Sequence, residues 1–207
     1  SNLLIGNLRT FIFMNNVMKK DYHIILSSNS PRRKELLAGL DLDFDIHVIP
    51  GIDESYPEDM PVMEIAEYIS TKKAEAYKNI IEPNNLIITA DTVVILGDEV
   101  LGKPKNLDDA KRILHELSGK VHHVVTGVCL TSLVKQKHFS VVTDVAFKLL
   151  SDSEINYYVE HYKPLDKAGA YGIQEWIGYI GVTSIKGSYF NVMGLPVQRI
   201  YKELQEF

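Results

Sequence analysis

The sequence has only one cysteine, Cys129, among its 207 residues, so no disulfide can form within the chain. Cys129 lies in the apolar run VVTGVCL, which favours a small buried residue of the core over a reactive thiol. A chain without an internal disulfide suits a reducing compartment, and we therefore expect a cytoplasmic location.

The sequence also has no excess of basic residues. Lysine and arginine together number 22 against 27 aspartate and glutamate residues, which gives a net charge of −5. A nucleic-acid binder needs a broad basic surface to neutralise many phosphates. We therefore expect no nucleic-acid partner, and a site for a polyanion has to be a local pocket.

Long apolar segments are missing as well. Residues 3–18 come nearest, but Gly6 and several polar residues interrupt them, and the stretch is shorter than the roughly 20 residues that cross a membrane. The stretch also lacks the small-residue cleavage site that follows the apolar core of a signal peptide. We interpret residues 1–17 as a tag or N-terminal extension and residues 18–207 as a single domain with no membrane partner.

Within this domain, the patterns typical of strands and of helices alternate along the chain. Strands are predicted at 22–26, 44–50, 86–96, 99–101, 122–132, 141–150, 176–185 and 189–193. Helices are predicted at 32–40, 60–79, 107–118, 151–161 and 196–204. Gly97-Asp98 is typical of a hairpin turn, so some strands should be antiparallel. The alternation predicts an α/β fold with a mixed, twisted sheet flanked by helices.

The segment SSNSPRR, residues 27–33, follows the first predicted strand and opens a helix. Ser30 before Pro31 is a good N-cap followed by a first-turn proline. The free N–H groups of a helix N-terminus suit a phosphate, and Arg32 and Arg33 add guanidinium donors. Two interpretations stay open here, a phosphate-binding turn that includes Ser28 and Ser30, or an ordinary capped helix with two solvated arginines.

Asp91 interrupts the most apolar stretch of the chain, LIITADTVVIL at 86–96. A charge buried in a strand is costly unless it is paired or binds a metal. Carboxylate oxygens are preferred ligands of Mg²⁺, which usually also contacts substrate phosphates. Asp91 is therefore a candidate metal ligand or general base, and the alternative is a carboxylate that caps a turn at the edge of the sheet.

Other polar groups are weaker candidates when each is considered alone. Lys103 lies between Gly102 and Pro104, and Lys73 lies on a predicted helix, so either could reach a phosphate or remain on the surface. Gln174 ends a segment rich in small residues that would let a ligand approach the backbone, and the alternative is a tight loop. Glu54 lies in a loop, where it is either solvated or a second metal ligand. The pair His122-His123 has no companion at metal-ligand spacing, which favours a structural or surface role.

Several familiar catalytic signatures are missing. The sequence contains no serine nucleophile elbow, no CxxC pair and no GxxxxGK[ST] loop. Dispersed phosphate-binding groups together with carboxylates instead favour metal-assisted attack of water on phosphorus.

Taken together, five segments resemble the successive signature blocks of the Maf family. In order, they are ILSSNSPRRKELL, ADTVVILGDEVLGKP, LSGKVHHVVTGV, PLDKAGAYGIQ and GSYFNVMGLPV. The resemblance runs from about residue 24 to the C-terminus. It implies a two-lobed α/β fold with a cleft, similar to inosine triphosphate pyrophosphatases. It also implies a metal-dependent nucleotide pyrophosphatase that cleaves between the α- and β-phosphates, often as a homodimer.

The resemblance also implies roles for individual residues. Asp91 matches the catalytic proton acceptor of the family. Arg32, Thr92 and Gln174 match the specificity positions in the form typical of the branch that hydrolyses dTTP and UTP. The remaining polar positions of the family site are matched by Ser28, Arg33, Glu54, Lys73 and Lys103.

We therefore expect a nucleoside triphosphate substrate and a divalent cation, Mg²⁺ or Mn²⁺, held by Glu54 and Asp91. The phosphates would be neutralised by the turn with Ser28 and Ser30 and by Arg33, Lys73 and Lys103. Two alternatives remain: a non-catalytic nucleotide-binding regulator of cell division, since the family is also associated with septum formation, or an inosine/xanthosine triphosphate pyrophosphatase.

Overall fold

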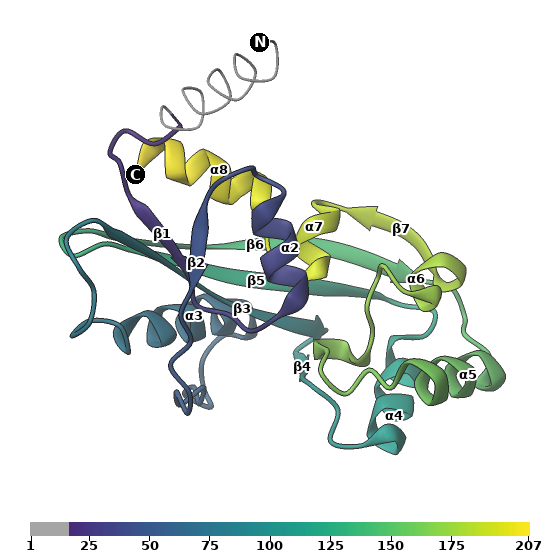
Figure 1. The fold of residues 1–207 in the computed structure, drawn as a ribbon. Helices are drawn as coiled ribbons and strands as arrows, with labels where there is room; N and C mark the ends of the chain where they lie inside the picture. The colour runs from purple at the N-terminus through teal and green to yellow at the C-terminus, as the bar shows by residue number, and fades with distance from the viewer. Residues whose placement is uncertain (1–16) are drawn as a thin grey trace, which may run out of the picture.

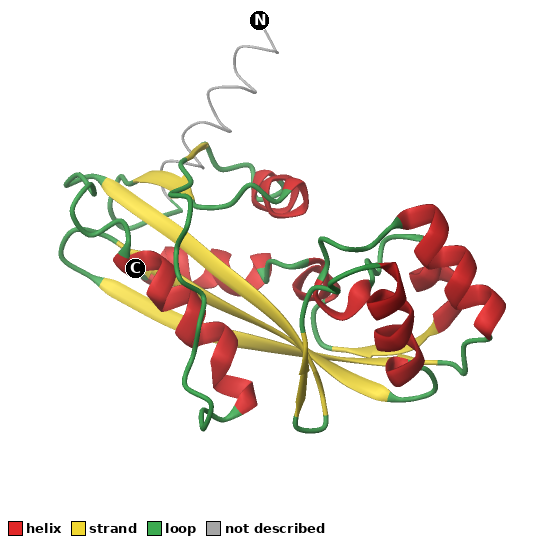
Figure 2. Cartoon of the chain, turned by 90° about the horizontal axis from the view of Figure 1, so that it is seen from below, coloured by secondary structure: helices red, strands yellow, loops and turns green. Residues whose placement is uncertain are grey.

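A computed structural model describes residues 17–207, and its centre is a twisted seven-stranded sheet (Figures 1 and 2). The strands are β1 (His23–Leu26), β2 (Phe44–Ile46), β3 (Asn85–Leu96), β4 (Glu99–Leu101), β5 (Val121–Thr131), β6 (Gln136–Phe147) and β7 (Val182–Lys186). Six of them follow the order β2-β1-β3-β5-β6-β7, and β4 pairs with β3. β1 is parallel to β2 and β3, whereas the other pairs are antiparallel. The predicted α/β fold with a mixed sheet is confirmed.

Helices cover both faces of the sheet and one of its ends (Figure 1). The α-helices are α2 (Pro31–Ala38), α3 (Ile65–Glu75), α4 (Leu107–Leu117), α5 (Asp152–Tyr162), α6 (Trp176–Gly181), α7 (Tyr189–Met193) and α8 (Val197–Glu206). Two 3₁₀ turns, η1 (Val62–Glu64) and η2 (Ala168–Ala170), accompany them. α3 packs on one face of β3 and β5, and α2, α7 and α8 lie on the opposite face.

The predicted strand pattern over 176–193 is wrong in most of its length. Residues 176–181 form α6 and residues 189–193 form α7, so only 182–186 belong to the sheet. Ser188 begins α7 by accepting a hydrogen bond from the Asn191 N–H at 3.1 Å, and Gly194, at φ 118°, ends it. A short apolar run fits one helical turn as well as a strand, so the capping residues on either side decide between them.

Three other predicted boundaries also differ from the structure. β2 ends at Ile46 instead of residue 50, because residues 47–50 leave the sheet for a loop. The long helix predicted at 60–79 is confined to 65–75 after a 3₁₀ turn. β6 begins at Gln136, five residues earlier than predicted, because polar residues at its start still pair with β5 across a short turn.

Two large apolar clusters fill opposite ends of the long central strands. The first packs β1, α2 and α8 against the early part of β3, and includes Leu37, Ile88 and Ile200. The second packs α4, α5 and α6 against the later part of β3, and includes Val94 and Tyr158. A third, smaller cluster joins α3 to the other face of the sheet. The two large clusters form two lobes, and the strands between them carry the polar residues described below.

One edge of β3 changes partners along its length. β1 pairs with residues 85–88 and β4 with residues 94–96, whereas β5 pairs with the opposite edge from residue 87 to residue 95. Within the described part of the chain, residues 89–93 therefore have no strand beside them on the β1 edge. Side chains alternate between faces along a strand. Asp91 points to the face covered by α3, and Thr92 points to the face covered by α2.

The N-terminal extension predicted at 1–17 lies outside the described residues except for Val17. That residue is 7% exposed and packs in the first cluster. In the described residues, no helix has the length and apolar character needed to cross a bilayer.

Candidate active site

Two adjoining cavities of about 440 and 460 Å³ lie at the unpaired edge of β3. They share seven lining residues, namely Ser30, Arg32, Arg33, Glu54, Lys73, Lys103 and Asp166. Asp91, Thr92 and Gln174 line the first cavity, and Ser28 lines the second. The structure therefore brings all ten site residues predicted from the sequence to one cleft. Its size falls within the range of small-molecule sites.

The turn after β1 forms the floor of the second cavity. Ser30 caps α2 by accepting a hydrogen bond from the Arg33 N–H at 3.3 Å, and the Ser28 hydroxyl accepts one from the Ser30 N–H at 3.1 Å. Pro31 occupies the first helical turn, as predicted. The N-terminus of α2 therefore faces the cavity. No acidic residue in the first turn of this helix would repel an anion there.

Arg33 reaches from α2 to β3 and is held by uncharged groups. Its Nε donates to the Gly194 carbonyl at 2.8 Å, Nη2 to the Thr92 hydroxyl at 3.0 Å and Nη1 to the Ala90 carbonyl at 3.4 Å. The Thr92 hydroxyl also lies 2.9 Å from that of Thr126 on β5. These contacts fix the guanidinium without neutralising its charge, so the charge remains available to a bound anion.

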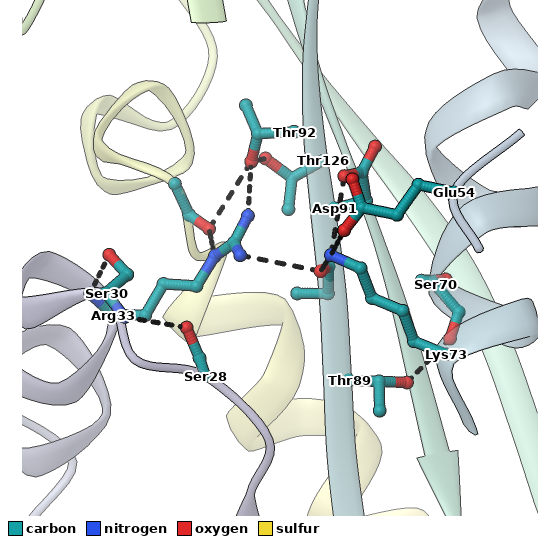
Figure 3. Close-up of polar contacts among 12 residues, drawn as sticks. Ser28, Ser30, Arg33, Glu54, Ser70, Lys73, Thr89, Asp91, Thr92 and Thr126 are labelled. Carbon is teal, nitrogen blue, oxygen red and sulfur yellow. Dashed lines mark hydrogen bonds and ion pairs between the residues drawn. The ribbon is translucent and has the colours of Figure 1, made fainter. Parts of the chain in front are cut away.

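Lys73 approaches the same strand from α3, on the opposite side (Figure 3). Its Nζ donates to the Ala90 carbonyl at 3.0 Å and lies 3.3 Å from Glu54 Oε1 and 3.5 Å from Asp91 Oδ1. The side chains of Lys73 and Asp91 are 16% and 15% exposed, and that of Glu54 is 59% exposed. The Ala90 carbonyl, which points to the unpaired edge, is thus bonded from both sides by cationic side chains.

The surroundings of Asp91 raise the pKa of its carboxyl. Burial is the largest cause and the charge of Glu54 adds to it, whereas Lys73 and Arg33 act in the opposite direction. A carboxyl whose pKa is raised in a cleft, beside cations, is a candidate general base. The alternative that Asp91 caps a turn is wrong, because Asp91 lies inside β3 and faces the first cavity.

The loop from 163 to 175 forms the wall of the first cavity opposite α2. Gln174 lines the cavity, and its buried Oε1 has no hydrogen-bond partner. Arg32 Nη1 lies 3.4 Å from Asp166 Oδ2, so an ion pair joins the two walls. Lys103 lines both cavities, as a phosphate-binding group would require.

Sequence reasoning missed three residues that support this wall, namely Tyr158, Lys167 and Glu175. The Tyr158 hydroxyl donates to Glu175 Oε1 at 2.8 Å and accepts from the Gly172 N–H at 3.1 Å. Lys167, only 12% exposed, lies 3.5 Å from the same Glu175 oxygen. Tyr158 comes from α5 and carries no local sign of its role, whereas Lys167 belongs to the quoted block PLDKAGAYGIQ and could have been found there.

Tyr77 was also missed, and it supports the other wall. Its hydroxyl donates to the His47 carbonyl at 2.7 Å, accepts from the Ile49 N–H at 3.2 Å and contacts the Ser27 hydroxyl. Tyr77 is 1% exposed. It therefore joins the chain after α3 to the turn after β1 and to the loop that leads to Glu54.

The remaining candidates have structural roles. His122 is fully buried, its Nε2 lies 2.5 Å from the Tyr171 hydroxyl, and burial lowers its pKa to about 4. His123 lies 2.5 Å from Asp144 on β6. Cys129 is fully buried, as predicted.

Whether the cleft can hold a divalent cation depends on the carboxylates that line it. Among residues 17–207, no group of three or more histidine, cysteine, aspartate or glutamate side chains could enclose a metal ion. Mg²⁺, however, is usually held by one or two carboxylates together with substrate phosphates. Asp91 and Glu54, which both contact the Lys73 ammonium, fit this second kind of site.

The fold and the cleft define an α/β protein whose pocket brings basic side chains and a helix N-terminus close to a largely buried carboxylate. Residues 23–207 match the model of the Maf-like protein family, and the chain belongs to this family.

The sequence similarity to several relatives covers about nine tenths of the chain. A dTTP/UTP pyrophosphatase of Phocaeicola vulgatus is 60% identical over 185 residues, which cover 89% of this chain and 96% of that protein. Another, from Bacteroides thetaiotaomicron, is 57% identical with the same coverage. One from Parabacteroides distasonis is 57% identical over 91% of this chain and 97% of that protein.

One solved structure shows a much weaker similarity. A nucleoside-triphosphatase / dITP/XTP pyrophosphatase from Mycobacterium abscessus matches 60% of this chain and 74% of its own, with 13% identity and a TM-score of 0.40. This likeness is too low to support an argument about function.

Proposed function

We propose that this protein hydrolyses dTTP and UTP to the nucleoside monophosphate and pyrophosphate. The relatives named dTTP/UTP pyrophosphatase support the substrate. The observation that carries the reaction is the position of Asp91, a half-buried carboxylate in one cleft with Arg33, Lys73, Lys103 and the N-terminus of α2.

In the proposed reaction, Asp91 orients or deprotonates the water that attacks the α-phosphorus. A bond forms between the water oxygen and the α-phosphorus, and the bond from this phosphorus to the α,β-bridging oxygen breaks, which releases pyrophosphate. The raised pKa of Asp91 makes it a stronger base than an ordinary aspartate. The proton passes to this carboxylate and then to solvent.

The phosphates of the substrate would lie against the basic side of the cleft. Arg33 offers guanidinium donors that uncharged groups already hold in place. Lys73 and Lys103 add point charges, and the turn with Ser28 and Ser30 adds backbone N–H groups. Such positioning and charge neutralisation is most of what phosphoryl-type transfer requires of a protein.

Glu54 and Asp91 would hold a divalent cation, Mg²⁺ or Mn²⁺, together with the substrate. When bound, the cation would neutralise phosphate charge and polarise the oxygens that it contacts. The spacing of both carboxylates around one ammonium supports this assignment.

The pyrimidine base would be recognised by Gln174 with Arg32 and Thr92, which line the first cavity. The amide of Gln174, a residue that lines this cavity, has both an acceptor and donors and so matches the N3–H and carbonyl groups of uracil or thymine. A buried site that hydrogen-bonds one base rejects others, because its own polar groups would then be left unpaired.

A panel of nucleotides tests the proposal. The purified chain is incubated with Mg²⁺ or Mn²⁺ and dTTP, UTP, CTP, dITP or XTP, and the products are separated. We expect pyrophosphate and monophosphate from dTTP and UTP. Release of orthophosphate would contradict cleavage between the α- and β-phosphates, and a preference for dITP or XTP would favour an inosine/xanthosine triphosphate pyrophosphatase. Binding without turnover would favour a non-catalytic regulator of cell division.

The single cysteine favours a cytoplasmic location, and the family resemblance favours a homodimer. Both stay predictions, and chromatography coupled to light scattering tests the homodimer.

A further inference from the structure

The Lys73 ammonium occupies the position between the two proposed metal ligands. An ammonium group has three N–H donors. In this site its three neighbours are the Ala90 carbonyl at 3.0 Å, Glu54 at 3.3 Å and Asp91 at 3.5 Å (Figure 3). Lys73 therefore donates one hydrogen bond to the Ala90 carbonyl, and its charge is already matched by two carboxylates of the protein.

The carboxylates of this site already have a cation beside them before any ligand binds. With both ionised, Asp91 and Glu54 flank the Lys73 ammonium, and Arg33 stands nearby without a carboxylate in ion-pair contact. A divalent cation that joined Asp91, Glu54 and Lys73 alone would leave a net positive charge in a partly buried site, beside the charge of Arg33. Charges in such a place interact more strongly than in water. The polyphosphate of a nucleotide supplies the negative charge that removes this imbalance.

We infer that Lys73 is an internal counter-cation that keeps the metal from binding tightly until the nucleotide arrives. The inference rests on the proposed function, because Glu54 and Asp91 are taken as the metal ligands. When both ligands enter, the metal takes the carboxylates and the Lys73 ammonium exchanges its carboxylate partners for phosphate oxygens. Metal and nucleotide then strengthen each other's binding, as linkage requires of two coupled ligands.

Lys72 provides a matched control on the same helix. Its Nζ lies 3.0 Å from Asp53 and donates to the Ser55 carbonyl at 2.6 Å, so it holds the same loop as Lys73 does. Lys72 lines neither cavity. Replacing Lys72 removes one positive charge and one anchor of the Glu54 loop without exposing the proposed metal ligands.

The test measures Mn²⁺ binding to the full chain without nucleotide, by the loss of the free Mn²⁺ electron paramagnetic resonance signal. Wild type, Lys73→Gln, Lys73→Arg and Lys72→Gln are compared. A neighbouring unit charge within ~4–6 Å changes the binding of a proton by about 1–3 powers of ten. We therefore expect Lys73→Gln to bind Mn²⁺ at least about tenfold more tightly than the other three proteins.

A second measurement adds a nucleotide. After subtraction of the Mn²⁺ that the analogue binds without protein, a dUTP analogue with an imido bridge between the α- and β-phosphates should raise the Mn²⁺ affinity of the wild type, and should raise that of Lys73→Gln by a smaller factor. Equal affinities in all four proteins, or a wild type that binds Mn²⁺ as tightly without the analogue as with it, would overturn the inference. Hydrolysis of dTTP and UTP by the wild type is measured separately, so failure of the proposed function is distinguished from failure of this inference.

Discussion

The two faces of β3 hold their cations in different ways. On the Thr92 face, Arg33 is bonded to a hydroxyl and to two carbonyl groups. On the Asp91 face, Lys73 is bonded to one carbonyl and lies beside two carboxylates. Asp91 and Thr92 are adjacent in sequence, and the alternation of the strand alone places them on opposite sides.

We propose that the two faces have different tasks. A cation held by uncharged groups keeps its position and its charge, which suits the recognition of a fixed anionic group. A cation held by carboxylates is neutralised until a ligand exchanges its partners. Arg32 and Thr92, proposed for base recognition, lie on the side of α2. Glu54 and Asp91, proposed for metal binding and proton transfer, lie beside Lys73 on the other side. The predictions below test this division, from the largest expected effect to the smallest.

Asp91→Asn tests the reactive face most directly. The amide keeps the shape of the side chain and cannot accept the proton, so we expect kcat for dTTP to fall by roughly a hundred- to ten-thousandfold. The raised pKa means that the folded state disfavours the ionised carboxyl, so stability falls as pH rises through the raised pKa. The variant should therefore unfold at pH 7 at a temperature no lower than the wild type.

Steady-state kinetics and thermal unfolding followed by circular dichroism measure both effects. Glu35→Gln on α2, which lines neither cavity, is the matched control for the loss of one carboxylate. Full activity in Asp91→Asn would remove this residue from the proposed chemistry and with it the division between the faces.

Arg33→Lys tests the fixed side. A lysine cannot contact Thr92, Ala90 and Gly194 at once, and hydrogen bonds of charged groups contribute about 1.5–3 kcal/mol each. We expect kcat/KM to fall about tenfold to a hundredfold, and the melting temperature to fall as well. Lys34→Gln, a neighbour outside both cavities, should leave both quantities nearly unchanged. An Arg33→Lys variant with unchanged kinetics would show that a fixed guanidinium is not needed.

The pH dependence of kcat/KM tests the Asp91 face alone, because Asp91 is the group expected to titrate. Asp91 has to be ionised to act as a base, and burial raises its pKa. The acid limb of log kcat/KM should therefore lie above the value of about 4 typical of an aspartate. Lys73 lowers this pKa, so Lys73→Gln should move the limb to higher pH, whereas Arg32→Gln should not. An acid limb at or below pH 4 in the wild type would contradict the role of Asp91.

Thr92→Val tests recognition without a change in charge. It removes the hydroxyl that accepts from Arg33 and contacts Thr126, at a cost of about 1 kcal/mol. We expect the preference for dTTP and UTP over CTP to fall several-fold, with a smaller change in kcat. The control is Thr89→Val on the same strand, because the Thr89 hydroxyl donates to Ser70 on α3, away from both cavities. Equal changes in nucleotide preference in both variants would argue for a general effect of the strand.

Tyr158→Phe tests the support of the recognition face and should have the smallest effect. The variant loses the hydrogen bonds to Glu175 and Gly172, which lie on either side of Gln174. We expect KM for dTTP to rise a few-fold, kcat to stay nearly constant and the unfolding free energy to fall by about 1 kcal/mol. Tyr157→Phe, at an exposed position of the same helix, should leave KM, kcat and the unfolding free energy nearly unchanged. A fall in kcat alone would place Tyr158 on the side of the chemistry.

Much of the fold could be predicted because its patterns are local. The apolar run of β3, the cap formed by Ser30 and Pro31 and the hairpin at Gly97-Asp98 each depend on a few neighbouring residues. The helices α6 and α7 were missed because their apolar residues also fit a strand over so short a length. Tyr77 and Tyr158 were missed for another reason, since their hydroxyl contacts join segments far apart in the chain.

By itself, the sequence determined that Asp91 stands in an apolar strand with Thr92 on the opposite face, and that a capped helix with two arginines follows β1. Only the tertiary structure decided that these segments meet. β1 and β4 pair with the two ends of one edge of β3 and leave residues 89–93 between them, so Arg33 and Lys73 reach the Ala90 carbonyl from opposite sides. Strand alternation is a property of neighbouring residues, whereas the partner of a strand edge depends on the packing of the whole chain.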